Sequence, residues 1–351
     1  MFNDREQHTP MSFVFLASLL LAAPQAVDNS WPAPPPNEDL NANMTYAEYS
    51  QQMDPSSHTY VPIPNSVSKR DWNGPVDTTT ANNFALMMQL AVSSYCPSTT
   101  NSKTWNCGVR CQGSLSGTVI VGSHENYASG AAGFVGYNPD QKMIVVSVRG
   151  TANIQSCIQD IQLWKTPADF GGFPNNQAPS SAQIHQGFKN TYIDLQPTLQ
   201  SGLETLAAQY PDYHIIFSGH SLGGAVVNLA ALDFYQNNPQ YADRISIYTF
   251  GEPRIGNLDF ANYIDSLPYA QRIFRVAKSG DIVPHLPPES FFNFAHHIDN
   301  FEITRFGTTT NFCVTTGPAG ESSSCSSDTT LLNLVDHITG YYGWWTYPWF
   351  C

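Results

Sequence analysis

The sequence predicts an α/β fold in which one mainly parallel sheet carries helices on its faces. Short apolar runs typical of buried strands alternate along the chain with segments of helical pattern, and such alternation is characteristic of parallel sheets. The run Met143–Val148 is apolar throughout, as expected of a central strand that is covered on both faces. A strand, a glycine turn and a helix follow one another around Ser221. In sheets of this type ligands bind beyond the carboxyl ends of the strands, so residues directly after strands are the catalytic candidates.

The individual elements follow from local pattern and turn signals. The first helix is expected at Thr79–Tyr95, where polar capping residues precede an amphipathic run. Before the central strand, short strands are expected at Thr118–Val121 and Ala131–Tyr137. The later elements are expected in this order: helix Pro197–Tyr210, strand His214–Phe217, helix Ala225–Tyr235, strand Ile245–Phe250, helix Leu258–Asp265 and strand Arg272–Ala277.

The first 70 of the 351 residues do not have the pattern of a folded domain. Ser12–Ala23 is an apolar run too short to span a bilayer, and it predicts a signal peptide over residues 1–26. Residues 27–68 are rich in Pro, Asn, Ser and Gln, a composition that does not bury enough apolar surface to order itself. The dibasic pair Lys69-Arg70 follows them and predicts a pro-segment over residues 27–70. Residues 71–351 are then one domain, and we expect a secreted, extracellular protein.

The charge balance narrows the choice of partners. The formal net charge is −13 at pH 7, and an acidic surface argues against nucleic acid and anionic membranes as main partners. No other apolar stretch is long enough for stable membrane insertion. A neutral substrate fits this composition, while the oligomeric state does not follow from the sequence.

All seven cysteines lie after the dibasic pair, and in an oxidising compartment most of them should pair. Six cysteines permit fifteen connectivities, so the pairing stays open from sequence alone. Closeness in sequence favours Cys107–Cys111 and Cys313–Cys325, which leaves Cys96 to pair with Cys351 and Cys157 unpaired. A zinc site is the alternative, but the spacings do not match a paired CxxC signature, and no metal is expected.

Ser221 lies in the pattern Gly-x-Ser-x-Gly, formed with Gly219 and Gly223 between a strand and a helix. This arrangement is the nucleophile elbow, in which the glycines let strand and helix approach and the serine is presented at the positive end of the helix. The alternative is a glycine-rich turn with an idle serine. The elbow predicts a chain order of Ser, then Asp or Glu, then His.

Two acidic residues follow strands after Ser221. Glu252 is possible, but Asp281 is preferred because it follows its strand through a glycine turn and leads into a rigid proline run. An ordinary turn aspartate is the alternative. The later histidines are His285, His296, His297 and His337. His285 lies too close to Asp281 in a stiff segment, and a lone histidine such as His337 is more often structural.

Several motifs occur together in one chain order: Val148–Thr151, Gly219–Gly224, Tyr248–Asn257, Gly280–Pro288 and Asp336-His337. In these motifs and their spacing, residues 75–351 resemble the filamentous-fungal class 3 lipases, which have the α/β-hydrolase fold. The resemblance implies that Ser221 is the nucleophile, His337 the general base and acid, and Asp281 the residue that orients it. It also implies an oxyanion hole formed by the backbone N–H groups of Leu222 and Thr151.

The resemblance further implies a short helical lid at Asn153–Leu163. Within it Ile154, Ile158 and Ile161 have the spacing of one apolar helix face, which would equally suit a surface helix packed on the core. Cys157 departs from the family pattern, and Asp160 is a candidate to hold the open lid or the Thr151 hydroxyl. The positions that match substrate-lining residues of the family are Tyr95, His185, Phe188, Val283 and Pro288.

The sequence and the resemblance together indicate a secreted triacylglycerol lipase that acts on acylglycerols at a lipid–water interface through an acyl-enzyme, without a cofactor. A feruloyl or other carboxylic ester hydrolase is the alternative within the fold. A non-catalytic lipase-like binding protein is a third possibility, disfavoured because Ser221, Asp281 and His337 are all present.

Overall fold

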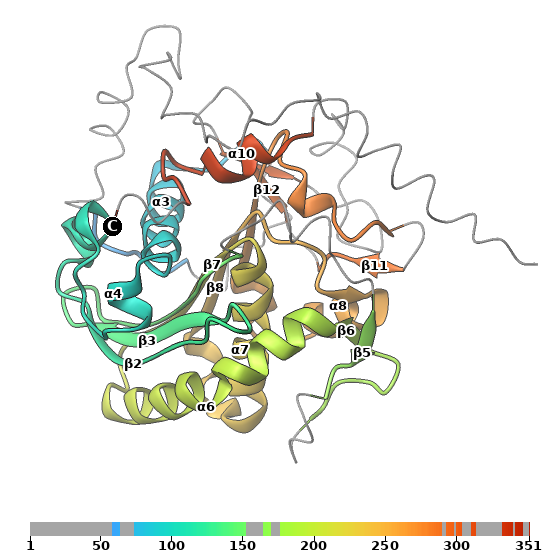
Figure 1. The fold of residues 1–351 in the computed structure, drawn as a ribbon, viewed down its shortest axis with the longest axis horizontal. Coiled ribbons are helices and arrows are strands. Elements are labelled where there is room, and N and C mark those ends of the chain that lie inside the picture. Colours follow the sequence, from blue (N-terminus) through green and yellow to red (C-terminus); the bar gives the residue numbers. More distant parts are fainter. Residues whose placement is uncertain are drawn as a thin grey trace, which may run out of the picture. The chain divides into compact units, whose positions relative to one another are not determined.

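Parallel strands form the centre of the main sheet. The computed structural model describes residues 58–63, 74–151, 164–169, 176–289, 293–297, 300–303, 310–313, 332–339, 341–346 and 351. Within these residues a nine-stranded sheet has the order β1-β13-β12-β10-β8-β7-β4-β3-β2. Strands β4, β7, β8, β10 and β12 are parallel neighbours, and the outer strands pair antiparallel (Figure 1). The predicted α/β fold with a mainly parallel sheet is therefore confirmed at its centre.

The strands of the main sheet are β1 (Gly74–Pro75), β2 (Val119–Glu125), β3 (Ala132–Asn138), β4 (Met143–Val148), β7 (His214–His220), β8 (Ile245–Phe250), β10 (Ile273–Lys278), β12 (Asn300–Ile303) and β13 (Thr310–Cys313). A smaller sheet of the described residues has the order β11-β9-β6-β5. Its strands are β5 (Lys165–Pro167), β6 (Gln183–His185), β9 (Gly256–Asn257) and β11 (Phe294–Ala295).

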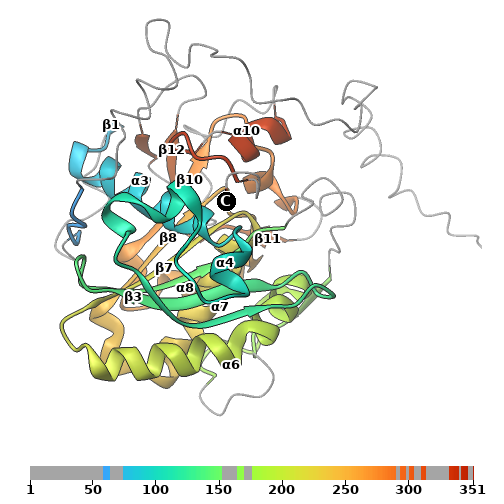
Figure 2. The same cartoon turned by 60° about the vertical axis from the view of Figure 1, so that its left-hand side comes forward.

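Helices cover both faces of the main sheet, as the views from two directions show (Figures 1 and 2). Helices α6 and α7 pack on one face and α3 on the other. The helices are α3 (Thr78–Ser93), α4 (Pro97–Thr100), α6 (Gln186–Gln209), α7 (Leu222–Asn237), α8 (Leu258–Asp265) and α10 (Leu334–Thr339). The short 3-10 helices are η3 (Gly108–Cys111), η4 (Gly113–Leu115), η5 (Pro239–Arg244), η6 (Ala270–Arg272) and η7 (Val283–His285).

The alternation of side chains along the strands divides the core into two layers. In β4, Ile144 and Val146 belong to the apolar cluster beneath α6 and α7, while Val145 belongs to the cluster beneath α3. Strand β8 divides in the same way, with Ile247 in the first cluster and Tyr248 in the second. Successive strand residues point to opposite faces, so a strand covered on both faces is apolar throughout.

One predicted helix begins earlier in the structure than expected. The helix expected at Pro197–Tyr210 begins eleven residues earlier, at Gln186, and Pro197 lies inside it. A proline removes the hydrogen bond to the carbonyl of the residue four positions before it, here Ile193. Ile193 is 38% exposed, so this turn faces solvent and its free carbonyl is accessible to water. His185 caps the true start, because its Nδ1 accepts from the N–H groups of Gly187 and Phe188.

The expectation that residues 27–68 stay unordered is wrong for residues 58–63. These residues pack against the domain, and Tyr60 is 5% exposed within the core cluster under α3. The composition argument considered only what the segment buries by itself, whereas Tyr60 uses apolar partners that the domain supplies. The expected signal peptide, the rest of the expected pro-segment and Lys69-Arg70 lie outside the described residues.

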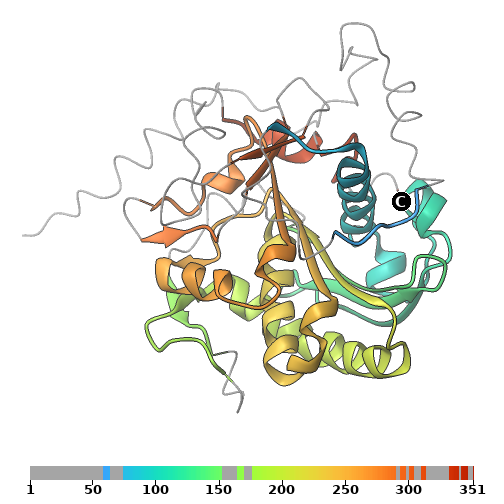
Figure 3. The ribbon, with the colours of Figure 1, turned by 180° about the vertical axis from the view of Figure 1, so that it is seen from behind.

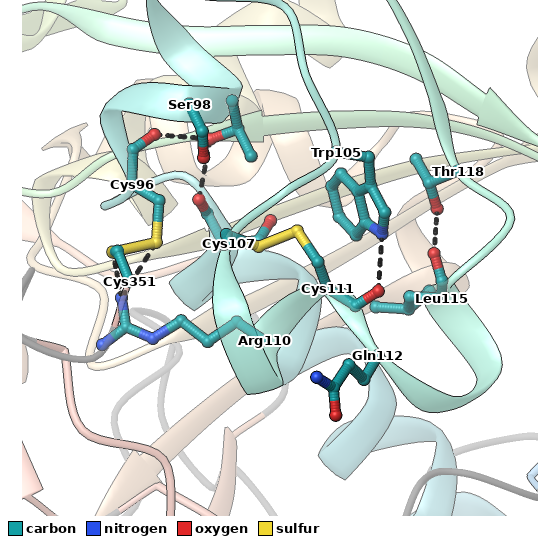
Figure 4. The surroundings of a disulfide bond; sticks show 12 residues. Cys96, Ser98, Trp105, Cys107, Arg110, Cys111, Gln112, Leu115, Thr118 and Cys351 are labelled. Carbon is teal, nitrogen blue, oxygen red and sulfur yellow. Dashed lines mark hydrogen bonds between the residues drawn. A yellow bond between two sulfur atoms is a disulfide. The ribbon is translucent and has the colours of Figure 1, made fainter.

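Two of the expected disulfides are present. Cys96 is bonded to Cys351, and Cys107 to Cys111. The buried Arg110 guanidinium lies against both sulfurs of the first pair (Figure 4). It also donates to the Trp345 carbonyl at 2.8 Å. The end of the chain is thereby tied to the segment after α3. Cys313 is disulfide-bonded as well, while its expected partner Cys325 and the lid residue Cys157 lie outside the described residues.

Candidate active site

The carboxyl ends of the parallel strands meet at one edge of the main sheet. Val148 at the end of β4 is paired with Gly219 of β7, and His220 of β7 is paired with Phe250, the last residue of β8. The register continues from Phe250 to Val276 of β10. The segments that follow these strands are therefore neighbours in space: residues 149–151, Ser221, Gly251 and residues 279–281.

Ser221 has a backbone conformation that non-glycine residues rarely adopt, with φ 60° and ψ −135°. Such a conformation costs about 1–3 kcal/mol, and residues held in it cluster at functional sites. The Ser221 N–H donates to the Phe250 carbonyl at 2.8 Å, which fixes the turn against β8. The serine therefore stands at the junction of strand and helix with its side chain raised from the backbone, as in a nucleophile elbow.

The two glycines that flank the Ser221 turn, Gly219 and Gly223, lie where there is no room for a side chain. A Cβ atom at Gly219 would lie 2.4 Å from the Gly223 carbonyl carbon, and one at Gly223 would lie 2.1 Å from the Val148 carbonyl oxygen. Real Cβ atoms do not come this close to backbone atoms. The prediction that neither glycine can carry a side chain is confirmed.

Asp281 and His337 form a fully buried pair. The Nδ1 atom of His337 lies 2.8 Å from Oδ2 of Asp281, and the two side chains are 1% and 0% exposed. A carboxylate only accepts, so the imidazole donates from Nδ1 and leaves Nε2 as its basic nitrogen. The Val283 N–H donates to the other carboxylate oxygen at 2.8 Å. The Tyr341 hydroxyl donates to Oδ2 at 2.6 Å, so three donors orient Asp281.

Helix α10, which carries His337, is held beside this loop by polar contacts. The Asn333 N–H donates to the Gly280 carbonyl at 2.8 Å, and the Asn333 side chain donates to Asp336 at 2.7 Å. Lys278, at the end of β10, forms a 2.9 Å ion pair with Asp336, and the two side chains are only 11% and 12% exposed. His337 is thus positioned by contacts to the strand that leads to Asp281.

Gly251 is a site residue that the sequence analysis missed. It has a φ of +61°, and a Cβ atom there would lie 2.8 Å from Oδ2 of Asp281 and 2.9 Å from Nδ1 of His337. Any side chain at this position would enter the space of the Asp–His hydrogen bond. Its position could have identified it, because Gly251 is the first residue after the strand β8, at the edge of the sheet where site residues are expected. Tyr341 was missed too, and no local pattern marks it.

Among the buried polar atoms that have no hydrogen-bond partner in the described part of the chain are Oγ of Ser221 and Nε2 of His337, so these two atoms are not hydrogen-bonded to each other. Buried polar groups are nearly always hydrogen-bonded, so an exception points to a functional role. Nucleophilic catalysis requires a serine hydroxyl that can reach the basic nitrogen of an oriented imidazole.

His220 has a structural role. Its Nδ1 lies 2.8 Å from the Tyr95 hydroxyl, and its Nε2 lies 3.0 Å from the His337 backbone carbonyl. A carbonyl only accepts, so Nε2 donates and Nδ1 accepts from Tyr95. Burial, followed by the nearby His337, holds the pKa of His220 well below its usual range. Tyr95, expected to line the substrate pocket, therefore contacts the site through His220.

The segment after β4 approaches Ser221 closely. A Cβ atom at Gly150 would lie 2.3 Å from the Tyr95 hydroxyl and 3.0 Å from Cβ of Ser221. Arg149 anchors this segment through a 2.7 Å ion pair with the buried Glu125. Thr151 follows directly, and Leu222 is the first residue of α7, so its N–H has no acceptor within the helix.

The remaining site candidates lie as follows. The rings of His185 and Phe188 pack against each other at the start of α6, tilted by 33° and with centroids 4.2 Å apart. Val283 is buried beside Asp281, and Pro288 is half-buried further along that loop. The lid candidates Ile154, Cys157, Ile158, Asp160 and Ile161 lie outside the described residues.

Glu252, the other acid considered, belongs to a different cluster. One of its carboxylate oxygens lies 3.0 Å from Nε2 of His297, and the other accepts from the Asn228 side chain at 2.9 Å. The cluster ties α7 to the segment after β11. His296 is also structural, because its Nε2 lies 2.7 Å from the Pro284 carbonyl. Asp281, the preferred acid, is the one that contacts His337.

Two further findings concern the described residues only. Their His, Cys, Asp and Glu side chains include no group of three or more that could hold a metal ion. None of their helices combines the length and apolarity needed to cross a membrane.

Comparison with known proteins agrees with this geometry. Residues 145–291 match the family model described as lipase (class 3). The chain is 32% identical over 281 residues to the lipase of Rhizopus niveus, covering 78% of this chain and 67% of that protein. It is 28% identical over 272 residues to secreted mono- and diacylglycerol lipase 1 of Fusarium solani, covering 75% and 77%. A solved triacylglycerol lipase structure whose catalytic centre is a serine protease triad superposes with a TM-score of 0.68, at 29% identity and with 78% and 97% coverage.

Proposed function

Since the chain belongs to the class 3 lipase family and is a carboxylic ester hydrolase, we propose that it hydrolyses long-chain acylglycerols with a triad of Ser221, His337 and Asp281. The observation that carries this proposal is the buried 2.8 Å hydrogen bond between His337 and Asp281 at the sheet edge that also presents the strained Ser221. A relative of similar sequence and fold is a triacylglycerol lipase with a serine protease triad.

In the first half of the reaction Nε2 of His337 takes the Ser221 proton while Oγ attacks the ester carbonyl carbon. Asp281 stabilises the imidazolium that forms and keeps the ring in the tautomer with a basic Nε2. The imidazolium then donates its proton to the leaving alcohol, and an acyl-enzyme on Ser221 remains. In the second half His337 takes a proton from water while the water oxygen attacks the acyl carbon. The imidazolium then returns that proton to Oγ of Ser221 as the bond between Oγ and the acyl carbon breaks, which releases the fatty acid and restores both residues.

The tetrahedral intermediates carry a negative oxygen, for which we assign the N–H groups of Leu222 and Thr151 as donors. Leu222 supports this because its N–H lies at the positive end of α7. Thr151 supports it because the adjoining Gly150 approaches Ser221 so closely. The loss of one donor of this kind typically lowers the rate by about 10²–10³-fold.

The lid and the substrate pocket complete the proposal. Residues 153–163, with Ile154, Ile158 and Ile161 on one face, would cover the site in water and meet lipid when open. Asp160 would hold the open lid or the Thr151 hydroxyl, and Cys157 would lie within the lid. The acyl and alcohol groups would lie against Tyr95, His185, Phe188, Val283 and Pro288.

We further propose that the protein is secreted, with a signal peptide over residues 1–26, a pro-segment over residues 27–70 and the lipase domain over residues 71–351. The disulfides at Cys96 and Cys107 support an oxidising compartment. A relative from Fusarium solani is a secreted lipase. The chemistry above needs no cofactor, and the proposed partner is an acylglycerol at the lipid–water interface.

The test is the hydrolysis rate of a long-chain triacylglycerol, measured against concentration through the solubility limit, for the wild type and Ser221→Ala. A rate that rises steeply when the emulsion forms, and is lost in Ser221→Ala, supports a lidded serine lipase. Turnover of soluble esters without such a rise would indicate a soluble-ester or feruloyl esterase. Undiminished activity in Ser221→Ala would refute the assignment of the nucleophile.

A further inference from the structure

His220, the residue before Ser221, lies between two parts of the site that come from distant segments of the chain. Its ring centroid is 6.1 Å from that of Tyr95, which follows α3, and 4.3 Å from that of His337 in α10. The view from behind shows α3 and the red α10 on the same side of the main sheet, opposite α6 (Figure 3). His220 is 1% exposed, so its contacts lie within the protein.

Two hydrogen bonds join His220 to these neighbours. The Tyr95 hydroxyl lies 2.8 Å from Nδ1 of His220, and Nε2 lies 3.0 Å from the backbone carbonyl of His337. Because a carbonyl only accepts, Nε2 carries the ring proton and Nδ1 accepts from Tyr95. The Tyr95 hydroxyl is in turn packed against Gly150, where an added Cβ atom would lie 2.3 Å from it. One line of contacts therefore runs from the segment after β4 to α10, through the residue that precedes Ser221.

The His337 carbonyl needs a donor from outside its own helix. Helix α10 ends at Thr339, and the last four carbonyls of a helix have no partner within it. His220 supplies the donor through Nε2. Asp281 contacts Nδ1 of the His337 side chain at 2.8 Å. The proposed general base is thus held at two points, its ring by Asp281 and its backbone by His220.

The ring of His220 has to stay neutral for this arrangement to serve the reaction. Burial, followed by the nearby His337, holds the pKa of His220 well below its usual range. His337 becomes an imidazolium when it takes the Ser221 proton, and a second positive ring with its centroid 4.3 Å away would oppose this step. A neutral imidazole carries its proton on either nitrogen, and the hydrogen bond at the other nitrogen decides which. Tyr95 is that partner, because it donates to Nδ1.

We propose that His220 and Tyr95 are positioning residues for the catalytic base: Tyr95 fixes the tautomer of His220, and His220 holds the backbone of His337. This inference rests on the proposed triad and deepens it. Packing alone would be served by an apolar side chain at position 220, whereas positioning requires a donor at Nε2 and, for an imidazole to be that donor, a partner at Nδ1. Tyr95 therefore acts on the base through His220, in addition to any contact with the acyl group.

A double-mutant cycle on a soluble short-chain ester tests this order of action. Tyr95→Phe keeps the ring and removes the donor to Nδ1, so it should lower kcat about tenfold and leave KM within about twofold. In His220→Gln the side-chain amide can donate to the His337 carbonyl without help from Tyr95, so kcat should fall less than about fivefold. Tyr95→Phe added to His220→Gln should then cost less than about twofold, because the two residues act in one network. His220→Met, which has no donor, should lose about 10²-fold in kcat.

Tyr248→Phe is the matched control. It also removes a buried hydroxyl, which contacts Tyr60 instead of the site, so it should leave kcat unchanged. NMR of nitrogen-labelled histidine gives a readout that does not depend on activity. The signals of His220, assigned by their loss in His220→Gln, should show a neutral ring with its proton on Nε2 in the wild type and a mixture of tautomers in Tyr95→Phe.

Several results would overturn the proposal: an unchanged kcat in Tyr95→Phe, an effect on KM alone, equal losses from Tyr95→Phe in both backgrounds, or a wild-type proton on Nδ1 of His220. Ser221→Ala, measured alongside, separates this proposal from the proposed function. Full activity in Ser221→Ala would remove the triad and the positioning role with it, whereas an inactive Ser221→Ala together with additive losses would overturn the positioning role alone. If thermal unfolding shows that His220→Met does not fold, the cycle and the NMR signals still decide.

Discussion

Gly251→Ala is the substitution that most sharply separates the geometry of the Asp–His pair from general stability. The new methyl group would lie 2.8 Å from Oδ2 of Asp281 and 2.9 Å from Nδ1 and Cε1 of His337. These atoms form the 2.8 Å hydrogen bond of the pair. Both side chains are buried and cannot yield without moving the loop or α10, so the bond should lengthen or break.

Gly251→Ala should affect both the stability of the fold and kcat. The backbone at residue 251 has φ +61°, which costs about 1–2 kcal/mol for a residue with a Cβ atom. A disoriented imidazole in a serine triad lowers kcat by up to about 10⁴-fold, so we expect a loss of about 10²–10⁴-fold. Gly130→Ala is the matched control, because Gly130 has φ +74° and no atom within 4 Å of its added Cβ. It carries the backbone strain without the intrusion.

The assay is turnover of a soluble short-chain ester, which does not require the lid to meet an interface, together with thermal unfolding. Gly130→Ala should lose about 2–4 °C in Tm from the backbone strain, and Gly251→Ala should lose more because its methyl group also displaces buried atoms. Gly130→Ala should keep its kcat within twofold, while Gly251→Ala should lose the expected factor. If Gly251→Ala keeps a kcat near that of the wild type, the Asp281–His337 bond is not what orients the base, and the reasoning fails.

Three further predictions follow from single contacts. Tyr341→Phe removes the hydroxyl that donates to Asp281 at 2.6 Å. It should lower kcat about tenfold or more, since hydrogen bonds to charged groups are stronger than those between neutral groups. Tyr342→Phe is the control and should leave kcat unchanged, because the Tyr342 hydroxyl contacts Thr310 instead. Burial raises the pKa of Glu302 from 4.5 to about 7, so the folded chain keeps this proton while the unfolded chain releases it, and stability is lost as pH rises between these values. Glu302→Gln should therefore raise the Tm at pH 8 and leave it unchanged near pH 4, and an equal change at both pH values would contradict this. The disulfides Cys96–Cys351 and Cys107–Cys111 close loops with sequence separations of 255 and 4 residues, and the chain-entropy model gives them about 5 and about 2 kcal/mol of stability. In denaturant unfolding, the free energy of unfolding should therefore fall more in the Cys96→Ser/Cys351→Ser double variant than in Cys107→Ser/Cys111→Ser. The reverse order would refute the entropic account.

The features that could be predicted from the sequence are those with a local signature. The strand Met143–Val148 is apolar throughout because both of its faces are covered, and it was predicted with its exact bounds. The elbow around Ser221 depends on residues close in sequence, so its glycines reveal it. Asp281 could be selected because it follows a strand at the edge where ligands bind.

Features that depend on distant contacts could not be predicted in this way. Gly251 is required by His337, which lies 86 residues later, and Tyr341 is defined by its hydrogen bond to Asp281 rather than by any pattern around it. Short edge strands such as β13 have too few residues to show a period. Tyr60 was placed in an unordered segment because composition measures what a segment buries by itself, and its partners are Tyr248 and His214.

The central claim is that Ser221 is the nucleophile, and covalent trapping tests it most directly. A p-nitrophenyl alkylphosphonate, which reacts with an activated serine, should add one group per chain, and peptide mass analysis should place that group on Ser221. The Ser221→Ala variant should neither react nor hydrolyse esters. An adduct on another residue, or hydrolysis by Ser221→Ala near the wild-type rate, would contradict the account.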